Sequence, residues 1–203
     1  MNNPVSHPNS PQLLCGVDEA GRGPLVGPVF AAAVIFKNGP LEGLADSKKL
    51  SAAKRERLFD AILAECWVGI GSASAAEIDQ VNILQATFLA MERAVGALAI
   101  QPERIVVDGN RLPPFAGFPR EALEAIVKGD ATCPQISAAS IVAKVSRDRY
   151  MAEMEKRYPG YGFAKHSGYG VPAHMEALRL LGPCPEHRKT FAPVANLIGG
   201  LGG

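Results

Sequence analysis

Two short apolar runs joined by a glycine-rich loop constrain the fold of this chain more than any other feature. Leu13–Val17 and Val29–Phe36 have the length and composition of β-strands, and the second is apolar almost throughout, as is typical of a strand buried on both faces. The loop between them, residues 18–28, contains three glycines and two prolines. Two strands joined by so short a connection can pair antiparallel, so we expect the sheet to begin with this pair.

The segments that follow alternate between helix and strand. Helices are expected over residues 52–66, 75–98, 135–156 and 172–181, and strands over 67–72, 104–107 and 122–127. The helix over 75–98 is expected to break near Val81–Asn82, and a helical turn fits 122–127 as well as a strand does. Strands separated by helices can pair in parallel, so the order predicts an α/β fold with a mixed sheet flanked by helices.

The length of 203 residues is sufficient for one domain with a substantial core. We expect a disordered tail over residues 1–12, a single domain over 13–198 that includes a helical C-terminal part, and a flexible tail over 199–203. The net charge of +1 says little about partners, but residues 128–189 hold ten Lys and Arg against six Asp and Glu, a weak indication of a basic face.

The four cysteines lie far apart and form no C-x-x-C pair. A chain this long and apolar does not need disulfides, although the even number leaves a disulfide framework as the alternative. We interpret them as free thiols in a reducing compartment. The N-terminus lacks the basic start and apolar run of a signal peptide, and the longest apolar run is too short to cross a bilayer, so a cytoplasmic protein that does not enter a membrane is expected.

Carboxylates stand where three of the expected strands end. Asp18 and Glu19 follow the first strand, Asp108 follows the strand over 104–107, and Asp130 comes shortly after residue 127. Such residues often only start turns or cap helices. Hard oxygen donors also suit Mg²⁺, and two such ions about 3.5 to 4 Å apart can stabilise both reacting oxygens when a phosphodiester is cut. Because neighbouring strand residues point to opposite faces, Asp18 is the firmer ligand, and Glu19 joins it only if the strand bends.

The glycine loop is a poor match to a dinucleotide site. Gly21, Gly23 and Gly27 do not have the G-x-G-x-x-G spacing, two acids precede them where a pyrophosphate would be repelled, and a strand follows where that motif needs a helix. Close approach of the backbone to a sugar-phosphate chain suits Gly21–Gly23 better, with Arg22 free to reach a phosphate.

Several other polar residues are open to two interpretations. Ser140, Lys144 and Arg147 share one face of the expected helix over 135–156, so this row can face solvent or a ligand. Asp148 is interpreted as a partner for Arg147. Tyr169 lies between two glycines and is expected to project from a loop, where stacking on a sugar or base and packing in the core are both open.

For two lysines and three histidines elsewhere in the chain, we take a role without direct function as the default interpretation. Lys48 and Lys49 are solvated charges by default, with phosphate contact as the alternative. His166, His174 and His187 lack metal-ligand spacing and are interpreted as surface or packing residues.

A series of motifs in one order resembles bacterial ribonuclease HII, the type 2 ribonuclease H. The motifs are GVDEAGRGPL at 16–25, DSKKL at 46–50, NILQAT at 82–87, VDG at 107–109, KGD at 128–130, SAASIVAKV at 137–145, SGYG at 167–170 and HRKTF at 187–191. The resemblance implies a ribonuclease H-like fold, with a mixed five-stranded sheet flanked by helices and a helical C-terminal extension. It also implies a metal-dependent endoribonuclease that uses two divalent ions, Mg²⁺ or Mn²⁺.

The implied reaction is hydrolysis of the RNA strand of RNA–DNA hybrids and incision 5′ of single ribonucleotides embedded in duplex DNA, leaving 3′-hydroxyl and 5′-phosphate ends. By the resemblance, the catalytic and metal-binding residues are Asp18, Glu19, Asp108 and Asp130. By the same resemblance, the substrate-binding residues are Gly21, Arg22 and Gly23 at the 2′-hydroxyl, Tyr169 at the junction, and Lys48, Asn82, Ser140 and Lys144 at backbone phosphates, with Arg147 as a further candidate.

We expect the chain to act as a monomer on RNA–DNA hybrids and on ribonucleotide-containing duplex DNA. The alternative is a non-catalytic nucleic-acid-binding module. Carboxylates beside phosphate argue against that alternative, because binding alone gains nothing from them.

Overall fold

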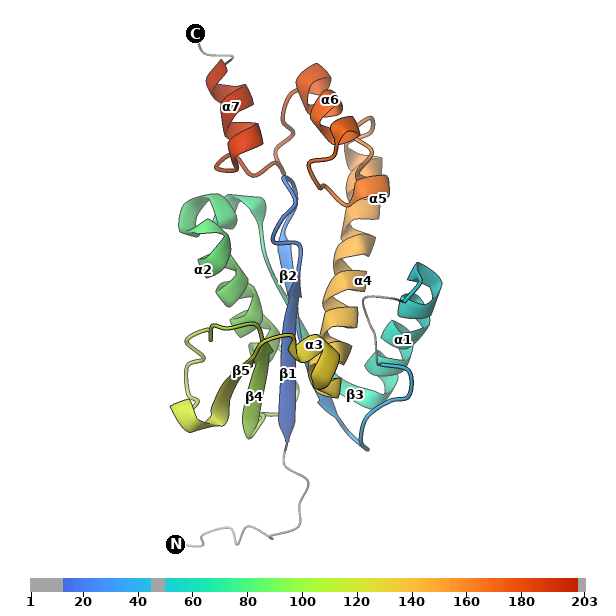
Figure 1. The fold of residues 1–203 in the computed structure, drawn as a ribbon, viewed down its shortest axis with the longest axis vertical. Coiled ribbons are helices and arrows are strands. Elements are labelled where there is room, and N and C mark those ends of the chain that lie inside the picture. The colour runs from blue at the N-terminus through green and yellow to red at the C-terminus, as the bar shows by residue number, and fades with distance from the viewer. Residues whose placement is uncertain (1–12, 45–49, 201–203) are drawn as a thin grey trace, which may run out of the picture.

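The computed structural model describes residues 13–44 and 50–200 (Figure 1). The strands are β1 (Leu14–Ala20), β2 (Val29–Phe36), β3 (Cys66–Ala73), β4 (Arg104–Asp108) and β5 (Leu123–Ile126). The helices are α1 (Ala52–Glu65), α2 (Ala75–Gly96), α3 (Gly129–Thr132), α4 (Pro134–Arg157), α5 (Phe163–His166), α6 (Pro172–Leu181) and α7 (Ala192–Gly200). A 3₁₀ turn over Arg120–Ala122 precedes β5.

The five strands form one mixed sheet in the order β3-β2-β1-β4-β5. β1 pairs antiparallel with β2, and β2 pairs antiparallel with β3. β1 pairs in parallel with β4, and β4 with β5, as expected where a helix or a long connection separates two strands. The predicted mixed five-stranded sheet is therefore confirmed, with β1 at its centre.

Helices cover both faces of this sheet (Figure 1). α2 buries its apolar side against one face, and α4 and α1 cover the other. Gly16 in β1 allows α4 to come close, because a Cβ at this position would lie 2.2 Å from the carbonyl carbon of Gln135. The long helix α4 is thereby held directly against the central strand.

The C-terminal helices gather beyond the end of β1, where the glycine loop begins (Figure 1). Val26 forms an isolated antiparallel bridge with His187, and the amide of Gly27 donates to the carbonyl of Glu186 at 2.9 Å. The amide of Leu25 donates to the carbonyl of Gly168, also at 2.9 Å. Segments from the two ends of the chain thus meet around residues 21–28.

Several local features agree with the sequence and others do not follow from it. α2 is kinked at Asn82, whose φ is 69°, as the expected break near Val81–Asn82 requires. The strand expected over 122–127 is present, with the 3₁₀ turn in front of it. The four-residue helices α3 and α5 lie in stretches without helical periodicity and are not anticipated. α7 extends through Gly199 and Gly200, two residues of the segment for which a flexible tail is predicted.

The four cysteines are free thiols, as expected, and three of them are buried. Across the part of the chain that the structure describes, no helix has both the length and the apolarity needed to cross a bilayer.

Candidate active site

Three of the four predicted carboxylates, those of Asp18, Glu19 and Asp108, lie at the same edge of the sheet. β1 and β4 pair in parallel up to Val17 opposite Val107, so Asp18 and Asp108 each follow that last pair. Asp108 is linked to the fourth carboxylate through the backbone, because its Oδ1 accepts hydrogen bonds from the amides of Gly129, at 2.7 Å, and Asp130, at 3.4 Å. The side chain of Asp130 is buried at the start of α3.

The turn that brings Asp130 to Asp108 depends on local geometry. Lys128 adopts a left-handed conformation, with φ of 57°, which reverses the chain between β5 and α3. A Cβ on Gly129 would lie 2.5 Å from Cδ1 of Ile136 and 3.5 Å from Oδ1 of Asp108. A side chain at residue 129 would therefore displace the terminal methyl group of Ile136, and it would lie in ordinary contact with the Asp108 carboxylate.

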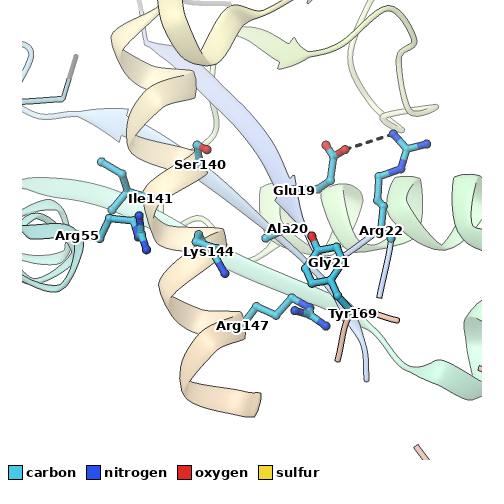
Figure 2. Close-up of a pocket in the computed structure, with 11 residues that line it drawn as sticks. Glu19, Ala20, Gly21, Arg22, Arg55, Ser140, Ile141, Lys144, Arg147 and Tyr169 are labelled. Atoms are coloured by element: carbon cyan, nitrogen blue, oxygen red, sulfur yellow. Dashed lines mark hydrogen bonds and ion pairs between the residues drawn. The ribbon is translucent and has the colours of Figure 1, made fainter. Parts of the chain in front are cut away.

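The strand does not bend between Asp18 and Glu19. Both belong to β1, which continues to Ala20. Gly16 faces α4 and Val17 packs in the core on the α2 side, so alternation turns Asp18 toward α4 and Glu19 toward α2. The carboxylate of Glu19 forms an ion pair with Arg22 at 3.3 Å, drawn as the dashed line in Figure 2.

These carboxylates nevertheless interact electrostatically. Burial raises the pKa of Asp18 well above its usual range, and the charges of Glu19 and Asp108 raise it further. Hydrogen bonds from the amide of Glu19, at 2.7 Å, and from the hydroxyl of Ser140 oppose this rise. Burial also raises the pKa of Glu19, Arg22 opposes that rise, and Asp108 adds to it. The site therefore brings buried carboxyl groups close together, and among the described residues Arg22 is the cation that opposes the rise, at Glu19.

A hard divalent cation fits this donor set, because carboxylate oxygens are its preferred ligands and its charge offsets the repulsion between them. The side chains are not gathered around one point: within residues 13–44 and 50–200, no three Asp, Glu, His or Cys side chains are arranged to hold a single ion. Glu19 is turned to Arg22, and Asp130 lines a separate hollow of about 260 Å³ beside Cys133.

A cavity of about 460 Å³ opens beside the carboxylates, between the end of β1 and α4. Figure 2 shows Ser140, Lys144 and Arg147 on successive turns of α4, facing Glu19 and the glycine loop. The residues that line it are Glu19, Ala20, Gly21, Arg22, Gly23, Arg55, Ser140, Ile141, Lys144, Arg147 and Tyr169. A neighbouring cavity of about 390 Å³ is lined by Glu19, Arg22 and Asp108 among others, so Glu19 lies between the two.

Two buried arginines, Arg147 and Arg188, bind the backbone carbonyls of the glycine loop. Arg188 donates from Nη2 to the carbonyl of Gly21 at 2.6 Å, from Nη1 to that of Arg22 at 2.8 Å, and from Nε to that of Gly27 at 2.9 Å. Arg147 donates to the carbonyls of Ser167, Pro28 and Val26 at 3.0, 3.3 and 3.3 Å. Burial lowers the pKa of Arg188 to about 9, with the charge of Arg147 as the second cause. Neither guanidinium forms an ion pair with any residue that the structure describes.

These contacts orient the loop. In a trans peptide the carbonyl and the amide N–H point in opposite directions. The carbonyls of Gly21 and Arg22 accept hydrogen bonds from Arg188. The N–H groups of the same two peptides, which belong to Arg22 and Gly23, therefore point away from Arg188. Gly21 has φ of 97°, and a Cβ there would lie 2.1 Å from Nε of Arg147. The loop is thus fixed with two amide donors on the side away from the core.

Tyr169 lies against this loop. The residue is 48% exposed, as expected of an aromatic residue that projects between two glycines. A Cβ on Gly23 would lie 3.3 Å from Cε1 of Tyr169, so the ring is in contact with the loop. Residues almost 150 positions apart are thereby joined at one cavity.

The structure decides between the two interpretations of the polar row on α4. Ser140, Lys144 and Arg147 all line the cavity, and Arg147 does not face solvent: it is 1% exposed, because the loop carbonyls and Ser167 close over it. Asp148 acts on Arg147 through its charge, as expected of a partner, but its carboxylate pairs with Lys144 and accepts from the hydroxyl of Ser167 at 3.2 Å.

The remaining candidates are placed less directly. Lys48 lies outside the described residues. Asn82 lies at the kink of α2, where its Oδ1 accepts from the amides of Leu84 and Gln85 at 3.0 and 3.2 Å, and it does not line either cavity beside Glu19.

Sequence analysis missed two functional candidates. Arg55 of α1 lines the large cavity, although only the apolar side of that helix attracts notice in the sequence. Arg188 lies within a motif that was noted, HRKTF, but nothing in the sequence indicates that it holds a loop more than 160 residues away.

Comparison with known proteins agrees with this geometry. A family profile described as Ribonuclease HII matches residues 15–194. The chain belongs to the ribonuclease HII family. It is a metal-dependent endoribonuclease whose substrates are RNA–DNA hybrids. A non-catalytic binding module is therefore not supported.

Individual members of the family match over most of the chain. Ribonuclease HII of Paracidovorax citrulli (strain AAC00-1) is 59% identical over 194 residues, which cover 95% of this chain and 78% of that protein. The structure of ribonuclease H2 from Pyrococcus horikoshii OT3 superposes with a TM-score of 0.77 at 31% identity, covering 92% of this chain and 97% of that one. Ribonuclease HII of Archaeoglobus fulgidus, solved in complex with PCNA, gives a TM-score of 0.74 at 28% identity, covering 88% and 95%.

Proposed function

We propose that this ribonuclease HII incises duplex DNA on the 5′ side of a single embedded ribonucleotide, in addition to cutting the RNA strand of hybrids, and leaves 3′-hydroxyl and 5′-phosphate ends. The observation that carries the proposal is the cavity that joins Glu19, the Gly21–Gly23 loop and Tyr169. One carboxylate that we assign to cleavage, that of Glu19, lines this cavity together with the loop that we assign to recognition. A ribonucleotide can be detected next to the place where its phosphate is cut.

Recognition of the ribonucleotide is assigned to the loop. The 2′-hydroxyl is the group that distinguishes RNA from DNA at a given site. The outward N–H groups of Arg22 and Gly23 can donate to it, and the absence of side chains at Gly21 and Gly23 lets a sugar approach. Tyr169, exposed beside Gly23, is assigned to the DNA side of the junction, where its ring can stack on the next sugar.

Cleavage is assigned to Asp18, Glu19, Asp108 and Asp130. We propose that they hold two divalent ions, Mg²⁺ or Mn²⁺, which when bound activate the attacking water and stabilise the leaving oxygen. Burial and neighbouring carboxylates raise the pKa of Asp18 and of Glu19, and the charge of a bound cation would offset both effects. The hydrogen bonds from Gly129 and Asp130 fix the Asp108 carboxylate at the edge of the sheet.

Phosphate contacts on either side of the cut are assigned to Ser140 and Lys144, which line the cavity, and to Lys48 and Asn82. We also propose that the chain acts as a monomer, because one chain supplies both the carboxylates and the loop. Light scattering of the purified protein tests the monomer.

The experiment compares cleavage of three labelled duplexes: all-DNA, DNA with one ribonucleotide, and an RNA–DNA hybrid. Each is incubated with Mg²⁺, Mn²⁺ or a chelator, and the position and end groups of the cut are mapped. We expect the all-DNA duplex to stay intact and the single-ribonucleotide duplex to be cut on the 5′ side. Asp18→Asn and Asp108→Asn should each abolish cleavage while the fold persists, and Asp60→Asn, an exposed exchange on α1, should not. Turnover near the wild-type rate in both carboxylate variants would refute the assignment of Asp18 and Asp108 to cleavage.

A further inference from the structure

Three histidines form a compact cluster beneath the loop that carries Tyr169. We call His166, His174 and His187 the imidazole cluster. The rings of His166 and His174 stack at 4.7 Å between centroids with an interplanar angle of 18°, and those of His174 and His187 lie 5.4 Å apart. His174 is 0% and His187 1% exposed, and Phe163 packs edge-on against His174. Neither buried ring lines the large cavity.

Hydrogen bonds fix the direction of donation through the two buried rings. The backbone amide of Cys184 donates to Nδ1 of His187 at 2.9 Å, so this nitrogen carries no proton. In a neutral imidazole the other nitrogen then carries it. Nε2 of His187 consequently donates to Nε2 of His174 at 3.2 Å, which leaves Nδ1 of His174 as a donor. That nitrogen donates to the carbonyl oxygen of Tyr169 at 2.9 Å.

Burial favours the uncharged rings that this chain of hydrogen bonds requires. It lowers the pKa of His187 to about 4, with His174 as the second cause, and it lowers the pKa of His174. The two neutral rings therefore occupy opposite tautomers, with the proton on Nε2 of His187 and on Nδ1 of His174.

The third ring of the cluster, that of His166, binds Gly168, the residue that precedes Tyr169. The amide of Gly168 donates to Nδ1 of His166 at 3.2 Å, and Nε2 of His166 donates to the carbonyl of Tyr161 at 2.9 Å. The backbone on both sides of the Gly168–Tyr169 peptide is thus held by imidazole nitrogen, while the Tyr169 ring itself remains half exposed.

We infer that the His187–His174 pair is a positioning device for Tyr169: it anchors the Tyr169 carbonyl so that the exposed ring stays against Gly23. This inference rests on the proposed role of Tyr169 at the ribonucleotide junction. It assigns a task in substrate selection to two residues that touch neither the substrate cavity nor the carboxylates. Cleavage of a single ribonucleotide should depend on them more than cleavage of a continuous hybrid.

The first test measures the tautomers and needs no activity. Long-range ¹H–¹⁵N spectra of the wild-type protein labelled at histidine are recorded near pH 7.5. We expect the Nδ1–H form for His174 and the Nε2–H form for His187, assigned by comparison with His174→Asn and His187→Gln. The same tautomer for both rings, or a charged ring, would overturn the inference whatever the role of Tyr169.

The second test measures kcat/KM on the single-ribonucleotide duplex and on the hybrid. His174→Leu should lower kcat/KM on the former by about tenfold, the factor that corresponds to one ordinary hydrogen bond, with a much smaller loss on the hybrid. His174→Asn should restore most of the difference, because its amide nitrogen lies near the position of Nδ1 and can donate to Tyr169. Ile62→Ala, a buried change in α1 far from the cluster, controls for loss of stability.

Tyr169→Ala separates the two possible failures. If it is selective for the single-ribonucleotide duplex and His174→Leu is not, the positioning inference is refuted and the proposed function stands. If Tyr169→Ala lowers both activities equally, the proposed role of Tyr169 fails. Amide exchange at residues 168–171 then decides the anchoring: unchanged protection in His174→Leu relative to Ile62→Ala would overturn it.

Discussion

Replacing Gly21 by alanine tests how the glycine loop and Arg147 depend on each other. Gly21 has φ of 97°, where an L-residue is strained by about 1 to 3 kcal/mol. A Cβ there would also lie 2.1 Å from Nε and 2.3 Å from Cδ of Arg147. Arg147 would have to move away from carbonyls that it now holds at 3.0 to 3.3 Å, and losing one hydrogen bond to a charged group costs about 1.5 to 3 kcal/mol. Together these predict a loss of about 2.5 to 6 kcal/mol.

Gly39→Ala is a matched control. Gly39 has the same φ of 97°, and nothing lies within 4 Å of a Cβ built on it, so alanine there meets only the backbone strain. We expect urea unfolding to show a larger loss for Gly21→Ala than for Gly39→Ala by about 1.5 to 3 kcal/mol. Cleavage should be lost only in Gly21→Ala. Equal losses of stability would refute the reasoning, because they would mean that Arg147 yields to the new methyl group without cost.

Three further predictions concern the metal, the junction and the histidines. Mg²⁺ or Mn²⁺ should raise the melting temperature of the wild type but not of Asp18→Asn, because a cation bound only by the folded state stabilises it; an equal rise in both would place the ion elsewhere. Tyr169→Ala should lose much more activity on a single ribonucleotide than on a long hybrid, and equal losses would remove Tyr169 from the junction. Because the pKa of His187 is lowered to about 4, its contribution to stability is complete above about pH 6.5 and falls by about 3 kcal/mol as the pH drops toward 4. Urea unfolding between pH 4 and 8 measures how the free energy of unfolding depends on pH. If this free energy falls as steeply with decreasing pH in His187→Gln as in the wild type, the prediction is contradicted.

The positions of the carboxylates follow from the sequence because they depend on short-range rules. Asp18 and Asp108 each follow the apolar run of a strand, and because the two strands pair in parallel, both carboxylates lie at the same edge of the sheet. The period of two likewise predicts that Asp18 and Glu19 point to opposite faces, which they do. The exposed ring of Tyr169 and the kink at Asn82 follow from local composition in the same way.

The two buried arginines could not be predicted, because their surroundings come from distant parts of the chain. Helical spacing places Arg147 in a polar row with Ser140 and Lys144, but it cannot show that the glycine loop closes over the last turn of that row. Arg188 lies in a stretch with no periodic pattern, and its three acceptors are more than 160 residues away. The four-residue helices α3 and α5 are set by tight turns and are too short to show a period.

The contacts between Arg188 and the loop that follows β1 also bear on synthesis. Asp18, Glu19 and the loop are translated early, yet the guanidinium that orders the loop belongs to Arg188, which is added more than 160 residues later. A ribosome-bound nascent chain that already contains all five strands would therefore carry the acids without an ordered recognition loop. Competence to choose a substrate would arise only after the segment that carries Arg188 has been synthesised, as folding during synthesis proceeds from the N-terminal side.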